Sequence, residues 1–220
     1  MVTTERLPLS RARVVAEALA LVDAHGTEAL TMRRLGACLG VEAMSLYNHV
    51  ESKDDLLDGI ASLLLELVEV PEPPEQDWRR QLRAIASSVR EVGLRHPRAF
   101  PLLVSRRHTT LASWAPILGG FTEARRAGLA AGPSVHVVHT FAGFLVGFVL
   151  LETRASGDAS KAADHHPDDV PADQPRLREY VAACRVTTSD EQFDAGVALL
   201  IAGMEHLVET GAVDLPARHP

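Results

Sequence analysis

Five side chains within residues 31–53 have the chemistry needed to contact a nucleic acid. Arg33 and Lys53 carry positive charges that can pair with phosphate groups. Tyr47 and His49 can donate hydrogen bonds to phosphate oxygens, and Asn48 can pair with the edge of a base. These side chains act together only if the chain presents them on one rigid surface, so the surrounding elements decide their use.

Short helices separated by glycine surround these residues. The first helix is amphipathic, with Ser10 placed as its N-cap and Gly26 as its stop, and Gly40 can end the second helix in a left-handed conformation. A helix, a tight turn and a short helix form the helix-turn-helix pattern, in which the second helix enters the major groove. The predicted helices cover Arg11–His25, Thr31–Leu39 with Thr31 as the cap, Ala43–Val50 and Ser52–Val70.

Four runs, Leu30–Leu35, Leu39–Val41, Leu46–Val50 and Ser52–Leu57, resemble the DNA-binding domain of the tetracycline-repressor (TetR/AcrR) family of bacterial transcription regulators. The remainder resembles the regulatory domain of that family more loosely, through helix order and a closing helix over Phe193–Leu207. The resemblance implies an all-α fold in which an N-terminal three-helix helix-turn-helix DNA-binding domain is joined to a larger helical ligand-binding and dimerisation domain.

The function implied by the resemblance is sequence-specific transcriptional regulation. We expect a dimeric repressor that binds a palindromic operator in double-stranded DNA and is released by a small-molecule effector, which must bind two states unequally. Residues 1–51 would form the DNA-binding domain, 52–70 the connecting helix, and 71–220 the ligand-binding and dimerisation domain. The alternatives are a transcriptional activator or ligand-independent regulator of the same fold, or a helical protein-interaction module.

The resemblance also implies site residues. The groove-facing positions are Ala43, Met44, Ser45, Tyr47 and Asn48, and the phosphate-holding positions are Thr31, Arg33, Tyr47, His49 and Lys53. Ala43 and Met44 cannot form a bidentate hydrogen-bonded pair with a base, so apolar contact, for instance with thymine methyl groups, is expected to carry part of the readout. Arg6 and Arg11 could help grip the DNA backbone.

Acidic residues outnumber basic ones in the chain. The formal net charge is −7 over 220 residues, and residues 1–55 hold six Arg or Lys against eight Asp or Glu. Bulk electrostatic coating of nucleic acid is therefore excluded. Binding must depend on a few placed contacts, and two subunits on paired half-sites are needed.

The second half is predicted to be helical as well, over about residues 77–95, 101–106, 111–127, 134–152 and 190–210. Residues 153–175, rich in proline and aspartate, are expected to form a mobile surface loop. The stretch Val135–Leu151 is shorter than the roughly 20 residues that a bilayer requires, so a helix buried on all sides, either between subunits or inside a core, and no membrane, is expected. Small residues on two helices predict a homodimer interface: Gly143, Gly147, Ala195, Ala198, Leu199, Ala202 and Gly203.

Large or polar residues on central helices are candidates for effector binding: Leu63, Phe100, Leu103, Trp114, Phe121, His139 and Phe144. The drug- and magnesium-contacting positions of the tetracycline repressor fall on Glu69, Ile85 and Leu103, so a more apolar effector than magnesium-tetracycline is expected. No cofactor or metal site is predicted, because the pairs His136/His139 and His165/His166 lack further fixed ligands.

The chain has no motif that assembles a reaction centre. It contains no Gly-rich phosphate loop, no G-x-S-x-G elbow and no H-E-x-x-H, so it is not expected to be an enzyme. Cys38 and Cys184 lie far apart in sequence, which gives no disulfide framework, and Cys38 is expected to be a small buried residue. Residues 1–10 hold no apolar stretch typical of a signal peptide, so a cytoplasmic protein is expected.

Overall fold

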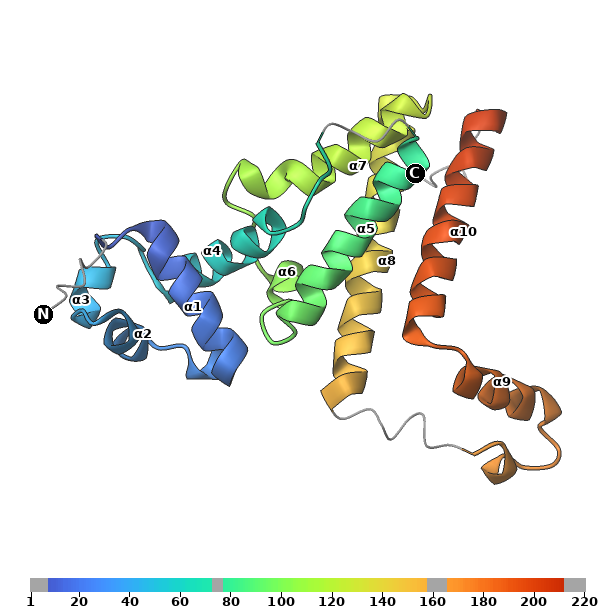
Figure 1. Ribbon diagram of the computed structural model, residues 1–220, viewed down its shortest axis with the longest axis horizontal. Helices are drawn as coiled ribbons and strands as arrows, with labels where there is room; N and C mark the ends of the chain where they lie inside the picture. The colour runs from blue at the N-terminus through green and yellow to red at the C-terminus, as the bar shows by residue number, and fades with distance from the viewer. Residues whose placement is uncertain (1–7, 73–76, 158–165, 212–220) are drawn as a thin grey trace, which may run out of the picture. The chain divides into compact units, whose positions relative to one another are not determined.

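The computed structural model describes residues 8–72, 77–157 and 166–211, and the described elements are all helices (Figure 1). The chain divides into two compact units. Unit 1 comprises residues 1–69 and 95–116, and unit 2 comprises residues 70–94 and 117–220. Residues 95–116 therefore pack with the N-terminal helices, although they follow them by many residues in the sequence.

Unit 1 contains α1 (Arg11–His25), α2 (Met32–Leu39), α3 (Ala43–Leu46), α4 (Lys53–Glu66), α6 (Leu102–Ser105) and two 3-10 turns, η1 (Thr27–Ala29) and η2 (Ala112–Trp114). The predicted caps of α1 are confirmed: the Ser10 side chain accepts a hydrogen bond from the Arg13 amide, and Gly26 has a φ of 81°. The core of unit 1 is formed by apolar residues that recur at helical spacing, among them Val14, Ala18, Val22, Leu35, Leu46, Leu56, Ile60 and Leu64.

Unit 2 holds most of α5 (Trp78–Arg95) and α7 (Ala115–Arg126), together with α8 (Ala131–Gly157), η4 (Pro167–Asp169), α9 (Pro175–Val186) and α10 (Ser189–Thr210). The helices α8 and α10 pack side by side. A capping box between Thr188 and Glu191 begins α10, and Gly211, with a φ of 66°, ends it. Its buried stripe is Phe193, Val197, Ile201 and Met204.

The second half departs from its predicted pattern in two elements. The loop expected over residues 153–175 is wrong at both ends, because Thr153 to Gly157 continue α8 and α9 begins at Pro175. Proline fits the first turn of a helix, so Pro167 and Pro175 begin helical turns here, and the His166 side chain caps the first of them. The prediction gave no helix over Pro175–Val186.

The helix α8 is not buried on all sides inside the core of a single chain, which rules out that form of the expectation and leaves burial between subunits as a prediction. Residues Ala131–Arg154 form a helix that is long and apolar enough to cross a membrane, by length and composition only. Its most apolar stretch of 18 residues has a mean hydropathy of 1.9, and 28% of that stretch is buried. Leu151 is 70% exposed and Val135 is 42% exposed. The helix α8 therefore packs against α10 and leaves another face exposed.

Three local expectations in unit 1 also need correction. The connecting helix predicted over Ser52–Val70 is α4, which Ser52 caps and which ends at Glu66. The helix α3 ends at Leu46 rather than Val50, and hydrogen-bonded turns complete residues 47–50. Cys38 is exposed, because Leu35 and Leu39 define the buried face of α2 and residue 38 is rotated about 100° from Leu39. Arg6 and His165 lie outside the described residues.

Candidate nucleic-acid interface

Two glycines, Gly36 inside α2 and Gly40 at its end, shape the approach of α2 to α3. Gly40 adopts the left-handed conformation with a φ of 68°, which ends α2 as predicted. A Cβ on Gly36 would lie 2.8 Å from the Val41 carbonyl oxygen and 3.2 Å from the Ala43 amide nitrogen. Since only hydrogen fits there, α2 and α3 approach each other closely and α3 has little freedom to move.

The outer side of α3 carries the residues predicted to face the groove. Leu46 is fully buried and anchors the helix, whereas Met44 is 75% exposed and Tyr47 is 45% exposed. Asn48 is exposed as well, while Ala43 and Ser45 are half-buried. A helix of four residues is too short to be stable alone, so its packing onto α2 through Leu46 holds this surface in place.

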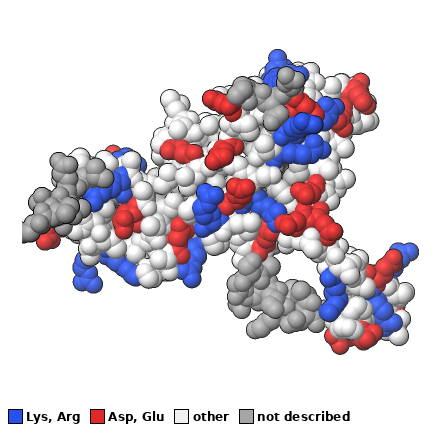
Figure 2. All heavy atoms as spheres, in the orientation of Figure 1, with Lys and Arg blue, Asp and Glu red and all other residues white. Residues whose placement is uncertain are grey.

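The residues predicted to hold phosphate lie in the same unit. Thr31 caps α2, its hydroxyl oxygen accepting from the Arg34 amide at 3.2 Å. Arg33 is exposed in the first turn of α2, and Lys53 is exposed as the first residue of α4. His49 is half-buried, just after α3. Over the N-terminal helices on the face shown in Figure 2, Lys and Arg side chains alternate with Asp and Glu and form no continuous basic surface.

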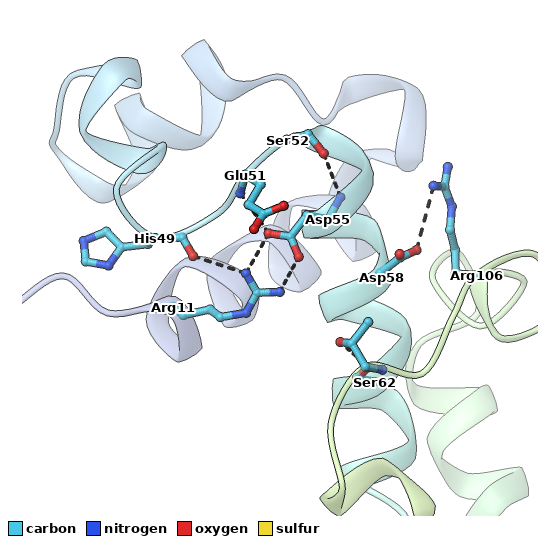
Figure 3. A network of polar contacts seen from close by, with 9 residues as sticks. Arg11, His49, Glu51, Ser52, Asp55, Asp58, Ser62 and Arg106 are labelled. Atoms are coloured by element: carbon cyan, nitrogen blue, oxygen red, sulfur yellow. Dashed lines mark hydrogen bonds and ion pairs between the residues drawn. The ribbon is translucent and has the colours of Figure 1, made fainter.

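A network of polar contacts ties the residues that follow α3 to α1 and α4 (Figure 3). Arg11, in the first turn of α1, forms a bidentate pair with the Asp55 carboxylate at 2.6 and 2.7 Å and donates to the His49 carbonyl oxygen at 3.2 Å. Asp55 also accepts from the Glu51 amide at 2.9 Å. The hydrogen bond from Arg11 is the largest cause that lowers the pKa of Asp55. Sequence reasoning assigned Arg11 to the DNA backbone and missed this network, because its partners are 38 and 44 residues away.

A second polar contact links α4 to residues 106–110. The acceptors on α4 are Asp54, Asp58, Ser62 and Glu66, which recur every fourth residue and so form one ridge. Arg106 lies 2.7 Å from Asp54 and 3.9 Å from Asp58. The Thr109 amide donates to Ser62 at 2.8 Å, and the Thr110 hydroxyl donates to Glu66. Residues 106–110, which follow α6, thus contact α4 along its length, and α4 is the helix that comes after α3.

The residues predicted for a dimer interface share one open face of unit 2. Ala195, Ala198 and Ala202 are exposed, and Leu199 is 74% exposed, on the side of α10 opposite its buried stripe. Apart from the neighbouring residues and backbone of its own helix, no atom of the described residues lies within 4 Å of a Cβ built on Gly143, Gly147 or Gly203. A groove of about 570 Å³ between α8 and α10 is lined by apolar side chains together with His136, His139 and Thr140.

The candidate effector residues are divided between the units. Leu63, Phe100, Leu103 and Trp114 belong to unit 1, and Phe121, His139 and Phe144 belong to unit 2. Phe100 is fully buried, whereas Trp114 is half exposed. His139 lines the α8–α10 groove, and Phe144 packs against Phe148 and Phe193 with ring centroids 5.7 and 6.2 Å away. Among the described residues no three His, Cys, Asp or Glu side chains are grouped to hold a metal.

The helix α3 is exposed on its outer side and is held against α2 by Gly36, Gly40 and Leu46. In an all-α chain with a second helical unit, this arrangement defines a helix-turn-helix DNA-binding regulator. Comparison with known proteins agrees. Residues 14–60 match the model of bacterial regulatory proteins of the tetR family, and residues 70–208 match the tetracyclin repressor-like C-terminal domain. The chain therefore belongs to the TetR family, and it is a DNA-binding repressor of the effector-regulated kind.

Individual relatives support this membership. The chain is 30% identical over 206 residues to the class C tetracycline repressor protein of Escherichia coli, covering 90% of this chain and 92% of the repressor. It is also 30% identical over 215 residues to an HTH-type transcriptional regulator of Saccharopolyspora erythraea, covering 89% and 84%. The crystal structure of ActR from Streptomyces coelicolor has a TM-score of 0.83 at 28% identity, covering 94% of this chain and 99% of ActR. ActR has also been solved in complex with actinorhodin, with a TM-score of 0.81 and 28% identity over 94% of this chain and 98% of that one.

Proposed function

We propose that the chain acts in the cytoplasm as a homodimer whose two copies of α3 read a palindromic operator. The observation that carries the proposal is the exposed apolar surface of α3, where Met44 and Tyr47 stand out from a helix that Leu46 anchors. Such a surface suits contact with thymine methyl groups better than a hydrogen-bonded code. The reading residues are Ala43, Met44, Ser45, Tyr47 and Asn48, and the phosphate contacts are Thr31, Arg33, Tyr47, His49 and Lys53.

The proposal is tested by selecting bound duplexes from a random DNA library and repeating the binding across a salt series. One palindromic site, with affinity that falls steeply as salt rises, is the expected result. Tyr47→Ala should weaken binding to that site by tenfold or more, whereas Tyr180→Ala, which alters the other tyrosine of the chain, should not. Recovery of no site by folded dimeric protein would contradict the proposal.

The open face of α8 and α10 supports dimerisation through four helices, two from each copy. Exposed apolar patches of this kind mark interaction sites in soluble proteins. The glycines of α8 and α10 leave room for the backbone of another helix. The proposed contact residues are Gly143, Gly147, Ala195, Ala198, Leu199, Ala202 and Gly203.

We assign effector control to a small, largely apolar molecule. ActR has been solved with actinorhodin, so this compound is a suitable first probe, and minocycline, which has been solved with a variant of TetR from Acinetobacter baumannii, is the contrasting tetracycline probe. Leu63, Leu103 and Trp114 are the proposed contacts in unit 1, since α4 packs against α6 and η2. A ligand there would change how residues 106–110 hold the ridge on α4.

Operator release and tryptophan fluorescence test this assignment. An effector should lower operator affinity and change the emission of Trp114, and Trp114→Phe should abolish the spectral change. Trp78→Phe is the matched control, because Trp78 is the other tryptophan and lies in α5 of unit 2. A spectral change that persists in Trp114→Phe but vanishes in Trp78→Phe would move the contact away from unit 1.

A further inference from the structure

The contact between Arg11 and Asp55 joins three segments that are far apart in sequence. The Arg11 guanidinium uses Nη1 and Nη2 for the two carboxylate oxygens, and Nη1 also donates to the His49 carbonyl oxygen (Figure 3). Asp55 in turn accepts from the Glu51 amide, and its own amide donates to Ser52 at 3.0 Å. This pair therefore joins the first turn of α1 and the first turn of α4 to residues 47–51, which follow α3.

Two of the proposed phosphate contacts depend on this junction. His49 provides the carbonyl that Arg11 holds, and Lys53 precedes the pair by two residues on α4. Because α3 has only four residues, its orientation is set by what holds its two ends. Gly36 and Gly40 hold the first end, and the Arg11–Asp55 pair holds the second. A recognition site requires its contacts to be placed to within about 0.5 Å, so this second end matters for affinity.

The chemistry of the pair argues against direct contact with DNA. The Arg11 charge is paired with a carboxylate, and its two terminal nitrogens already have acceptors. Asp55 carries a negative charge within the DNA-binding helices, which by electrostatics alone opposes binding to phosphate. We propose that Arg11 and Asp55 are positioning residues for operator recognition. They hold His49, which follows α3, and the start of α4 in place without touching DNA. This inference rests on the proposed DNA interface.

The sign of the Asp55→Asn effect tests the inference. Removing a negative charge near DNA should tighten binding, whereas loss of the bidentate pair should weaken it. Hydrogen bonds to charged groups are strong enough that we expect operator affinity to fall by about tenfold or more. Glu42→Gln is the matched neutralisation, because Glu42 is an exposed acid beside α3 whose side chain caps nothing, and it should bind as tightly as wild type or more tightly.

Substitutions of Arg11 separate positioning from phosphate contact. Each phosphate contact contributes about 0.9 to the slope of log affinity against log salt, so Arg33→Gln should reduce that slope. Arg11→Gln should lower affinity and leave the slope unchanged. Arg11→Lys keeps the charge but loses the fork that fits a carboxylate, so it should not restore affinity. A reduced slope in Arg11→Gln, or full affinity in Arg11→Lys, would overturn the inference.

Loss of folded protein must not imitate loss of affinity. The active fraction of each variant is measured by titration at a duplex concentration far above the dissociation constant and at a temperature well below the unfolding midpoint. Each measured affinity is then corrected for this active fraction. If wild type selects no operator, the proposed function fails. If wild type binds its operator and Asp55→Asn binds it equally or more tightly, only the positioning role fails.

Discussion

The carbonyl oxygen of Val41 occupies the space that a side chain on Gly36 would need. A Cβ there would lie 2.8 Å from that oxygen, while the Val41 amide donates to the Gly36 carbonyl oxygen at 2.9 Å. Gly36→Ala must therefore push α2 and α3 apart, at a cost of about 1–3 kcal/mol in the free energy of unfolding. Urea unfolding measures this. Gly132→Ala in α8 is the control, because its Cβ meets nothing within 4 Å and alanine favours a helix.

Leu199→Glu should break the proposed dimer. Burying a leucine side chain contributes about 1.5–3 kcal/mol, and a two-fold interface loses that contribution twice, so the dimer dissociation constant should rise by about a hundredfold or more. Sedimentation equilibrium measures the constant. Leu118→Glu, at a 61% exposed leucine in α7, provides a comparable charge outside this face and should leave the dimer intact. An unchanged dimer in Leu199→Glu would place the interface elsewhere.

Arg90 joins α5, α8 and α10 through two carboxylates of very different exposure. It pairs with Glu152 at 2.5 Å, where both side chains are largely buried, and with Asp190 at 2.6 Å, whose side chain is 81% exposed. Glu152→Ala leaves the buried guanidinium without its main partner and should lower the free energy of unfolding by about 3 kcal/mol. Asp190→Ala removes the exposed partner of the same guanidinium and should cost less than about 1 kcal/mol. Similar losses in thermal denaturation would contradict this ranking.

The pKa of Asp55 gives the stability of the DNA-binding helices a pH dependence. The hydrogen bond from Arg11 is the largest of the causes that lower it in the folded state. A lowered folded pKa means that the stabilisation is fully present above the unfolded pKa of about 4 and is lost as the pH falls through the folded value. The difference in unfolding free energy between wild type and Asp55→Asn should therefore be constant near neutral pH and shrink in acid. Chemical denaturation at several pH values measures it, and a difference that grows in acid would be the wrong sign.

Local signals account for what the sequence predicted well. The bounds of α1 and α2 follow from Ser10, Gly26, Thr31 and Gly40, whose conformations depend on their immediate neighbours. The family resemblance supplied the function, because the motif between Leu30 and Leu57 is continuous in sequence.

Features that depend on distant partners were not predicted. The sequence does not indicate that Arg11 pairs with Asp55, because this pair forms only when the fold brings α1 and α4 together. The attachment of residues 95–116 to unit 1 has no local signal either, since His96 pairs with Asp23 and Thr109 pairs with Ser62 across many residues. The helix α9 was missed although Leu177, Tyr180, Val181 and Cys184 recur at helical spacing, and none of its residues is buried.

The self-contained ends of α10 have a consequence for how this regulator can change over generations. Thr188 and Glu191 begin the helix through their own reciprocal hydrogen bonds, and Gly211 stops it, so neither end takes its register from the chain that precedes it. Insertions or deletions between α8 and Thr188 should therefore leave Phe193 and Met204 against their neighbours. Lineages can lengthen, shorten or rewrite that connection while the helix pair that carries the proposed dimer face is inherited intact.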